Sequence, residues 1–179
     1  LGIYATAVAA ERGASQVIVI DGQQHRLDRA TKCGATSIIS MTEYRTAESR
    51  VERVRELTHG IGADIVVEVV GVAEATYEGL DMVRINGTYL DIGNIGGGRL
   101  DIPAGKIIGN QTKWVGTVHY NPWIIEAALQ FLVKTKNQYQ LMDVVSDHFP
   151  LEKINEAFEF AEWQGKEQGT QAQRVALSI

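Results

Sequence analysis

The stretch Gln16-Val17-Ile18-Val19-Ile20-Asp21 decides the fold that we predict for this sequence of 179 residues. It has the pattern of a buried parallel strand that ends on a carboxylate, and it follows a helix of small residues that begins at Leu1-Gly2. A dinucleotide-binding unit uses such an acid, one helix after a glycine turn, to hold a ribose through two hydroxyl groups. We therefore expect Asp21 to bind a ribose.

The sequence begins inside this unit. It starts with Leu rather than Met, at the place of the third glycine in a Gly-x-Gly-x-x-Gly turn, so we interpret it as a fragment of a longer protein. We expect the sheet to lack its first strand. The strands near Ile18 and at 65–70 then lose a central neighbour, and their edges must be covered, paired with another chain or left unstable.

Composition excludes several classes of function. The 17 basic and 22 acidic residues give a net charge of -5, and no dense basic cluster is present, so we expect no nucleic-acid partner. The single cysteine, Cys33, excludes an internal disulfide. No apolar run is long enough to span a bilayer, so we expect no membrane partner and a cytoplasmic protein.

Helical and strand patterns alternate along most of the chain, which predicts an α/β fold: a Rossmann-like, doubly wound parallel sheet with helices on both faces. In the helix expected at 46–58, Ala47, Val51, Val54 and Leu57 share one face, and we interpret the charged residues, Arg50 among them, as a solvated face. The expected strands are 17–20, 37–39, 65–70, 87–93 and 114–118, the other helices are 3–12, 26–32, 73–83 and 122–134, and a different closing part has strand 144–148, helix 151–163 and strand 174–179.

The carboxyl ends of these strands predict a ligand crevice, because open parallel sheets bind ligands there. The backbone amides of Leu1 and Gly2, with the positive end of their helix, would face a pyrophosphate, and Gly2 would let that helix approach the sheet. The strand ends expected to line the crevice are Asp21, Val70-Gly71, Ile92-Gly93-Asn94 and Thr117-Val118-His119.

Asp21 also predicts the cofactor. A carboxylate accepts hydrogen bonds from the 2′- and 3′-hydroxyls of a ribose, whereas a 2′-phosphate would place negative charge against it, so we expect NAD rather than NADP. The neighbours His25 and Arg26 leave NADP open, since a cation there could contact either hydroxyls or a phosphate.

The order of motifs resembles the medium-chain, zinc-dependent alcohol dehydrogenase family over nearly the whole chain. The resemblance implies a nicotinamide dinucleotide-binding domain at 1–143, truncated at its N-terminus, and a segment at 144–179 that packs back on a GroES-like catalytic domain whose larger part is missing. The motifs that carry it are Leu1-Gly2, VIVID at 17–21, RLDRATKCGA at 26–35, GADIVVEVVG at 62–71, GTYLDIG at 87–93, Trp-x-Gly at 114–116 and HFPLEKINEAFE at 148–159.

The resemblance assigns cofactor-binding roles by position. Leu1 and Gly2 match the end of the pyrophosphate turn, Asp21 the ribose acid and Arg26 a cation beside it, and Val70 matches a residue that packs on the adenine. Arg174 matches a basic residue that reaches the pyrophosphate. The positions that match groups around the nicotinamide are Ile92, Asn94, Thr117 and His119.

The same resemblance implies an NAD-dependent, zinc-containing alcohol or polyol dehydrogenase, which transfers a hydride between NAD and an alcohol or carbonyl substrate. The zinc would be bound outside this chain, since one cysteine cannot build the family's zinc sites, and the fragment alone would be inactive, with no catalytic or metal-binding residue of its own. Family members pair subunits through the region of residues 114–118 and the helix after Pro122, which implies a homo-dimer or homo-tetramer.

Two other functions stay open: a zinc-free quinone or enoyl reductase of the same superfamily, and a non-enzymatic nucleotide-binding module. Leu1 before the glycine favours the zinc branch. Structural interpretations compete as well. Glu68, inside an apolar strand, could be a buried carboxylate with a structural hydrogen bond or a strand-edge residue, and Cys33 a core or helix-end thiol. The glycine-rich loop 93–98 lacks the lysine of a P-loop.

Overall fold

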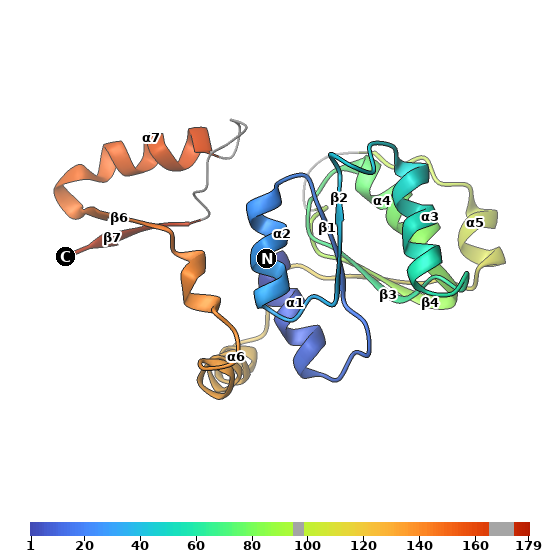
Figure 1. Cartoon of the computed structure of the whole chain (residues 1–179), viewed down its shortest axis with the longest axis horizontal. Helices are drawn as coiled ribbons and strands as arrows, with labels where there is room; N and C mark the ends of the chain where they lie inside the picture. The colour runs from blue at the N-terminus through green and yellow to red at the C-terminus, as the bar shows by residue number, and fades with distance from the viewer. Residues whose placement is uncertain (95–98, 165–173) are drawn as a thin grey trace. The chain divides into compact units, whose positions relative to one another are not determined.

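The computed structural model describes residues 1–94, 99–164 and 174–179. The chain divides into two compact units, Leu1–Ala128 and Leu129–Ile179, which are described separately (Figure 1). The glycine-rich loop expected at 93–98 lies outside the described residues from 95 onward. Among the helices in the described ranges, none combines the length and the apolar character that crossing a membrane requires.

The first unit is an α/β structure in which every strand pair is parallel, as predicted. Strand β1 (Ile18–Asp21) pairs with β2 (Ser37–Ser40), and β3 (Ala63–Glu68), β4 (Val83–Asp91) and β5 (Lys113–Gly116) form a second sheet in the order β3-β4-β5. The helices are α1 (Gly2–Glu11), α2 (Gln24–Lys32), α3 (Ala47–Leu57), α4 (Ala73–Met82) and α5 (Ala104–Gly109).

One hydrophobic core joins the two sheets through α3. Its centre consists of Ile39 from β2, Val54 from α3 and Met82 from α4, which are 0%, 3% and 5% exposed. Side chains from β1 and β3 pack against this centre, among them Ile20 and Val66. The two sheets therefore share a buried interior even though no hydrogen-bonded ladder joins them within the described residues.

Helix α3 begins where the sequence provides a cap. The Thr46 hydroxyl accepts a hydrogen bond from the Ser49 backbone N–H at 3.1 Å, and the Ser49 hydroxyl lies 3.3 Å from the Thr46 backbone N–H, which donates to it. This reciprocal arrangement is a capping box with serine in place of the usual Glu or Gln. It satisfies backbone donors that the first turn of a helix otherwise leaves without partners.

The prediction that Arg50 lies on a solvated face of α3 is wrong. Its side chain is 8% exposed and forms two short hydrogen bonds with Glu78 of α4, from Nε at 2.7 Å and from Nη2 at 2.6 Å. A third bond runs from Nη1 to the Tyr44 carbonyl oxygen at 2.9 Å. Pairing with Glu78 raises the pKa of Arg50, and the pair ties α3 to α4, which lie side by side (Figure 1).

The two faces of the β3-β4-β5 sheet differ in burial. On the face toward α4, Tyr89 is 0% exposed and stacks edge-on against Trp114 with ring centroids 5.3 Å apart, so Trp114 packs against the sheet. On the opposite face Ile65, Val67 and Val115 are 61%, 39% and 46% exposed. Within the described residues, helix α4 therefore covers one face of this sheet and leaves apolar side chains on the other.

The strand edges agree with the expected missing neighbour. Strand β1 pairs only with β2, and β3 pairs only with β4, among the strands of the described ranges. In the order expected for a doubly wound sheet, the first strand lies between these two. The described part of the chain thus contains the strands on both sides of that position and no strand in it.

The second unit pairs β6 (Asp147–Pro150) in parallel with β7 (Val175–Ser178) and packs α7 (Ile154–Gln164) against both strands. The first of these strands begins later than the predicted 144, because Leu141–Val144 forms a 3₁₀ turn. Helix α6 (Trp123–Thr135) spans the boundary between the units, and a second 3₁₀ turn covers Leu151–Lys153. The division of function between 1–143 and 144–179 stays a prediction.

We expect Arg50→Met to lower the free energy of unfolding by about 3 kcal/mol, because it leaves the buried Glu78 carboxylate without its partner. Chemical unfolding followed by circular dichroism measures the loss. The matched control is Arg53→Met, which breaks an ion pair with Glu56 whose partners are 36% and 57% exposed. That change should stay within experimental error, and equal losses in the two variants would contradict a special role for the buried pair.

Candidate functional site at the strand ends

The predicted ribose acid Asp21 is the last residue of β1. Its Oδ1 accepts a hydrogen bond from the Gln23 backbone N–H at 2.9 Å, which fixes the carboxylate above the turn into α2. Its Oδ2 lies 3.9 Å from Nη1 of Arg26, and the Asp21 side chain is 28% exposed. One carboxylate oxygen is therefore held by the backbone, and the other lies in a half-exposed position from which it can accept a hydrogen bond from a ligand.

His25 is part of the same turn. Burial and the neighbouring charge of Arg26 lower the pKa of His25, while Asp21 opposes the shift. Its Nε2 is buried and has no hydrogen-bond partner within the described residues. The imidazole is accordingly neutral at pH 7, and Arg26 is the charged member of this pair of neighbours.

The end of β3 is built around a buried carboxylate. Glu68 is 4% exposed, and its Oε1 accepts hydrogen bonds from the backbone N–H groups of Val70 at 2.5 Å and Gly71 at 2.7 Å. Its Oε2 accepts one from Nδ2 of Asn94 at 3.2 Å. The interpretation of Glu68 as a buried carboxylate with a structural hydrogen bond is confirmed, and the structure shows that the bonds reach two different loops.

The end of β4 is tied to its neighbours on both sides. Asn94 Nδ2 also donates to Thr76 Oγ1 at 2.7 Å and to Asp91 Oδ1 at 3.1 Å. On the other side, the Thr117 backbone N–H donates to the Asp91 carbonyl oxygen at 3.0 Å. The ends of β3, β4 and β5 therefore meet through hydrogen bonds, as expected for one crevice.

The Tyr89 phenol lies near the carboxylates at this edge of the sheet. Burial raises the pKa of the Tyr89 phenol; the Thr76 hydroxyl opposes the rise, and the nearby carboxylates of Glu68 and Asp91 add to it. The phenol therefore stays protonated throughout the physiological pH range.

Two glycines allow the loops after β3 and β4 to touch. Gly71 has a φ of +85°, and a Cβ added there would overlap the carbonyl oxygen of Gly93. A Cβ added at Gly93 would in turn overlap the backbone nitrogen of Gly71. Both positions require glycine, because each backbone occupies the space that a side chain of the other would need.

Helix α1 begins near the end of β3. A Cβ added at Gly2 would lie 3.7 Å from Cγ2 of Val69, which is an ordinary van der Waals distance. The helix does approach the sheet here, as expected, but within the described residues the approach does not itself require glycine. The first turn of α1 is closed by the bond from the Ala5 N–H to the Leu1 carbonyl oxygen at 3.1 Å.

The remaining predicted site residues differ in exposure. Leu1 and Val70 are each 69% exposed, Ile92 is half-buried, and Thr117 and His119 are exposed after β5. Arg174 belongs to the second unit, where its carbonyl oxygen accepts a bond from the Ser146 N–H at 3.0 Å. Their cofactor roles stay predictions.

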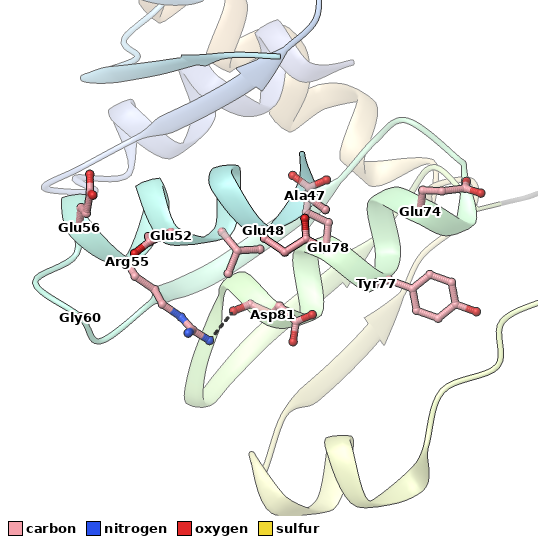
Figure 2. A pocket seen from close by; sticks show the side chains of 11 residues that line it. Ala47, Glu48, Glu52, Arg55, Glu56, Gly60, Glu74, Tyr77, Glu78 and Asp81 are labelled. Carbon is pink, nitrogen blue, oxygen red and sulfur yellow. Dashed lines mark hydrogen bonds between the residues drawn. The ribbon is translucent and has the colours of Figure 1, made fainter. Parts of the chain in front are cut away.

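A separate groove of about 930 Å³ lies along α3 and α4 (Figure 2). It is a poor site for a nucleotide, because carboxylates would repel a pyrophosphate and a single arginine, Arg55, faces the groove with them. In Figure 2 the Arg55 guanidinium points to the Asp81 carbonyl oxygen, 3.4 Å away. The acidic residues that line the groove are Glu48, Glu52, Glu56, Glu74, Glu78 and Asp81.

No metal site is apparent in residues 1–94, 99–164 and 174–179, where no three His, Cys, Asp or Glu side chains are arranged to hold an ion. Cys33 is buried at the C-terminal end of α2, as the core or helix-end interpretation expected.

Comparison with known proteins identifies the family. The profile described as zinc-binding dehydrogenase matches residues 1–134. The chain belongs to the zinc-binding dehydrogenase family. It is 31% identical over 160 residues to a 5-exo-hydroxycamphor dehydrogenase of Pseudomonas putida, and 32% identical over 170 residues to an L-threonine 3-dehydrogenase of Bacillus subtilis. Each match covers 89% of this chain and 44% of the relative, so the chain spans less than half the length of these family members.

Solved structures of the family share the fold. An alcohol dehydrogenase of Thermotoga maritima matches 99% of this chain and 47% of its own, with a TM-score of 0.85 and 26% identity. An alcohol dehydrogenase of Thermus sp. ATN1 matches 99% of this chain and 48% of its own, with a TM-score of 0.83 and 28% identity. The predicted family and the Rossmann-like fold are confirmed.

Sequence reasoning missed the tie between the two loops. Glu68 was expected to be buried, but not to bind both the 70–71 backbone and Asn94. The available signal was a carboxylate on an otherwise apolar strand, three residues before a glycine. A carboxylate in that place needs donors, and the nearest donors are the backbone amides of the turn that the glycine makes.

We expect Gly71→Ala to destabilise the protein by about 2 kcal/mol or more, because the residue has a left-handed backbone and its Cβ would overlap Gly93. Thermal unfolding is the measurement. The control is Gly105→Ala in α5, where a Cβ would meet nothing within 4 Å and the helix should gain about 0.5 kcal/mol. A melting temperature unchanged in Gly71→Ala would show that the two loops do not need their close contact.

Proposed function

We propose that this chain is the cofactor-binding part of an NAD-dependent, zinc-containing alcohol or polyol dehydrogenase. The observation that carries the proposal is the position of Asp21 at the carboxyl end of β1, with one oxygen held by the Gln23 N–H and the other beside Arg26. Membership of the zinc-binding dehydrogenase family supports the class of reaction. The relatives named above are dehydrogenases of a hydroxycamphor and of threonine, so the substrate class is an alcohol or its carbonyl product.

The adenosine half of the cofactor is assigned to the β1 end. The two ribose hydroxyls would donate hydrogen bonds to Asp21, and the Gln23 amide would keep the carboxylate in place while it accepts them. Arg26 would balance the carboxylate charge when no ribose is bound. The first turn of α1, near Val69, would offer backbone amides to the pyrophosphate.

Charge around Asp21 supports NAD over NADP. A 2′-phosphate carries negative charge into the place where the Asp21 carboxylate stands, and two cations would be needed to offset both. His25 does not supply one, because its pKa is lowered and it is neutral at pH 7. Arg26, the cation beside Asp21, would then face two anionic groups.

The nicotinamide half is assigned to the ends of β4 and β5, which meet through a backbone hydrogen bond, and Val70 after β3 is assigned to the adenine. Bound NAD would supply the hydride acceptor, and zinc held elsewhere in the whole protein would polarise the substrate oxygen. The residues of this chain would bind and orient the cofactor. Catalytic and metal-binding residues are expected outside it.

The proposal includes a cytoplasmic homo-dimer or homo-tetramer that pairs subunits near residues 114–118 and the start of α6. Exposed apolar side chains support pairing there. Val115 is 46% exposed, Val118 61% and Trp123 68%.

We expect the complete protein that carries this chain to bind NADH more tightly than NADPH, and Asp21→Ala to weaken NADH binding by about tenfold or more, as expected for two lost hydrogen bonds to a charged group. Titration with each nucleotide, followed by calorimetry or NADH fluorescence, measures both dissociation constants.

The matched control is Asp28→Asn, which alters a carboxylate on the same stretch of chain that bonds to Gln24 on the exposed side of α2. Its NADH affinity should equal that of the wild type. Tighter binding of NADPH would overturn the NAD assignment, and binding of neither nucleotide would overturn the proposed function. Zinc analysis of the purified complete protein separates the zinc enzyme from a zinc-free reductase, and turnover of alcohols with NAD separates an enzyme from a binding module.

A further inference from the structure

We infer that Glu68 is a positioning residue: its carboxylate fixes the loop after β4, which is assigned to the nicotinamide half of the cofactor, to the loop after β3, which carries Val70 of the adenosine half. The inference rests on the proposed function, since it concerns the same dinucleotide. It gives a specific role to a buried carboxylate that ribose recognition and the chemistry at the substrate do not use.

The first step is that, among the described residues, the donors that bond to the Glu68 carboxylate are all uncharged amides. Its 4% exposed carboxylate accepts from two backbone amides, at 70 and 71, and from the Asn94 amide. Burial of a carboxylate costs free energy unless such donors satisfy it. Breaking any of these hydrogen bonds is therefore unfavourable. The loop after β3 and Asn94, in the loop after β4, therefore cannot shift independently of each other.

The second step is that the main chain of Glu68 reinforces the side chain. Its carbonyl oxygen accepts from the N–H of Ile92 at 3.0 Å and of Gly93 at 3.2 Å. One residue thus binds backbone groups of both loops, and the Gly71–Gly93 contact leaves no slack between them. The two strand ends form a single rigid rim.

The third step concerns Asn94, which sequence reasoning placed among the groups near the nicotinamide. Its side-chain amide points inward, toward acceptors on Glu68, Thr76 and Asp91. The Asn94 side chain therefore fixes its loop to the rest of the rim. The backbone of that loop is the part that would contact the ligand. Backbone recognition needs a fixed loop, because an amide or carbonyl cannot be re-aimed by a rotamer change.

The fourth step is that this rim lies on a different sheet from the ribose acid. Glu68 and Asn94 belong to the β3-β4-β5 sheet and Asp21 to the β1-β2 sheet, and no ladder joins the two within the described residues. A change at Glu68 that releases Asn94 but keeps an acceptor for the amides at 70 and 71 should alter recognition of the nicotinamide half, while Asp21 and Val70 stay in place for the adenosine half.

The experiment compares two probes on the complete protein: NADH, and ADP, which lacks the nicotinamide and its ribose. We expect Glu68→Gln to weaken NADH binding by about tenfold, the loss of roughly one hydrogen bond to a charged group, and to leave ADP binding within about twofold of the wild type. Glutamine keeps the volume and one acceptor for the amides at 70 and 71, but it turns an NH₂ group toward the Asn94 NH₂, so the two donors repel and the loop of Asn94 is released.

Thr76→Val is the second variant and carries the test if Glu68→Gln does not fold. It removes an acceptor of Asn94 from the 0% exposed Thr76, nearly isosterically, and should give the same selective loss of NADH affinity, but smaller. The matched control is Glu78→Gln, another buried glutamate, which lies on α4 and pairs with Arg50. It should lower the melting temperature and leave the ratio of the two dissociation constants unchanged.

The outcomes separate the two proposals. A wild-type protein that binds neither probe overturns the proposed function, and this inference with it. If the wild type binds both probes but Glu68→Gln weakens them equally, the residue supports the fold in general and the positioning role is overturned. The same conclusion follows if NADH affinity does not change. Loss of NADH affinity alone is the result that the positioning role requires.

Discussion

Burial of the Glu68 carboxylate is the constraint on which the ligand edge of this chain depends. A carboxyl group on a residue that is 4% exposed needs donors, and the chain supplies them from two loops that are distant in sequence and adjacent in the sheet. The loop after β3 must turn sharply to present two successive amides, which is why Gly71 has a positive φ. The loop after β4 must come close enough to offer Asn94, which is why Gly93 has no room for a side chain.

Under the proposed function, this arrangement would let one edge of the α/β fold treat the two halves of a ligand differently. On the β1 side, a half-exposed carboxylate is presented directly, and a single backbone amide orients it. On the β3–β4 side, the carboxylate is withdrawn into the interior and acts on the backbone instead. A ribose has hydroxyls that suit an exposed acceptor. A flat ring that carries an amide can hydrogen-bond to fixed backbone groups. Folding has already ordered these groups, so binding to them costs little further conformational entropy.

Most of the fold follows from local patterns in the sequence. The strands β1 to β5 were predicted within a few residues because each contains apolar residues typical of a buried strand, and α3 begins at Ala47 because the Thr46 hydroxyl caps it. The short helix α5 was not predicted, since six residues give too little periodicity to recognise. Arg50 was placed in solvent because a pattern of charges does not reveal that a glutamate 28 positions later lies opposite it. Likewise, Glu68 could be predicted as buried, but its partner Asn94 lies 26 positions away and is brought close only by the register of β3 and β4.

The exposed apolar groups of the first unit show what a complete sheet must add. Strands β1 and β3 share the core around α3, yet each has a ladder on one edge only among the described strands, and Ile65 and Val67 stand on an uncovered face. A strand edge exposes backbone donors and acceptors, and an apolar face beside it adds surface that water solvates poorly. The relatives are more than twice as long as their matched region, so they contain ample chain to supply a strand between β1 and β3. Such a strand would satisfy both edges at once and would bring Asp21 and Glu68, now on separate ladders, into one hydrogen-bonded sheet.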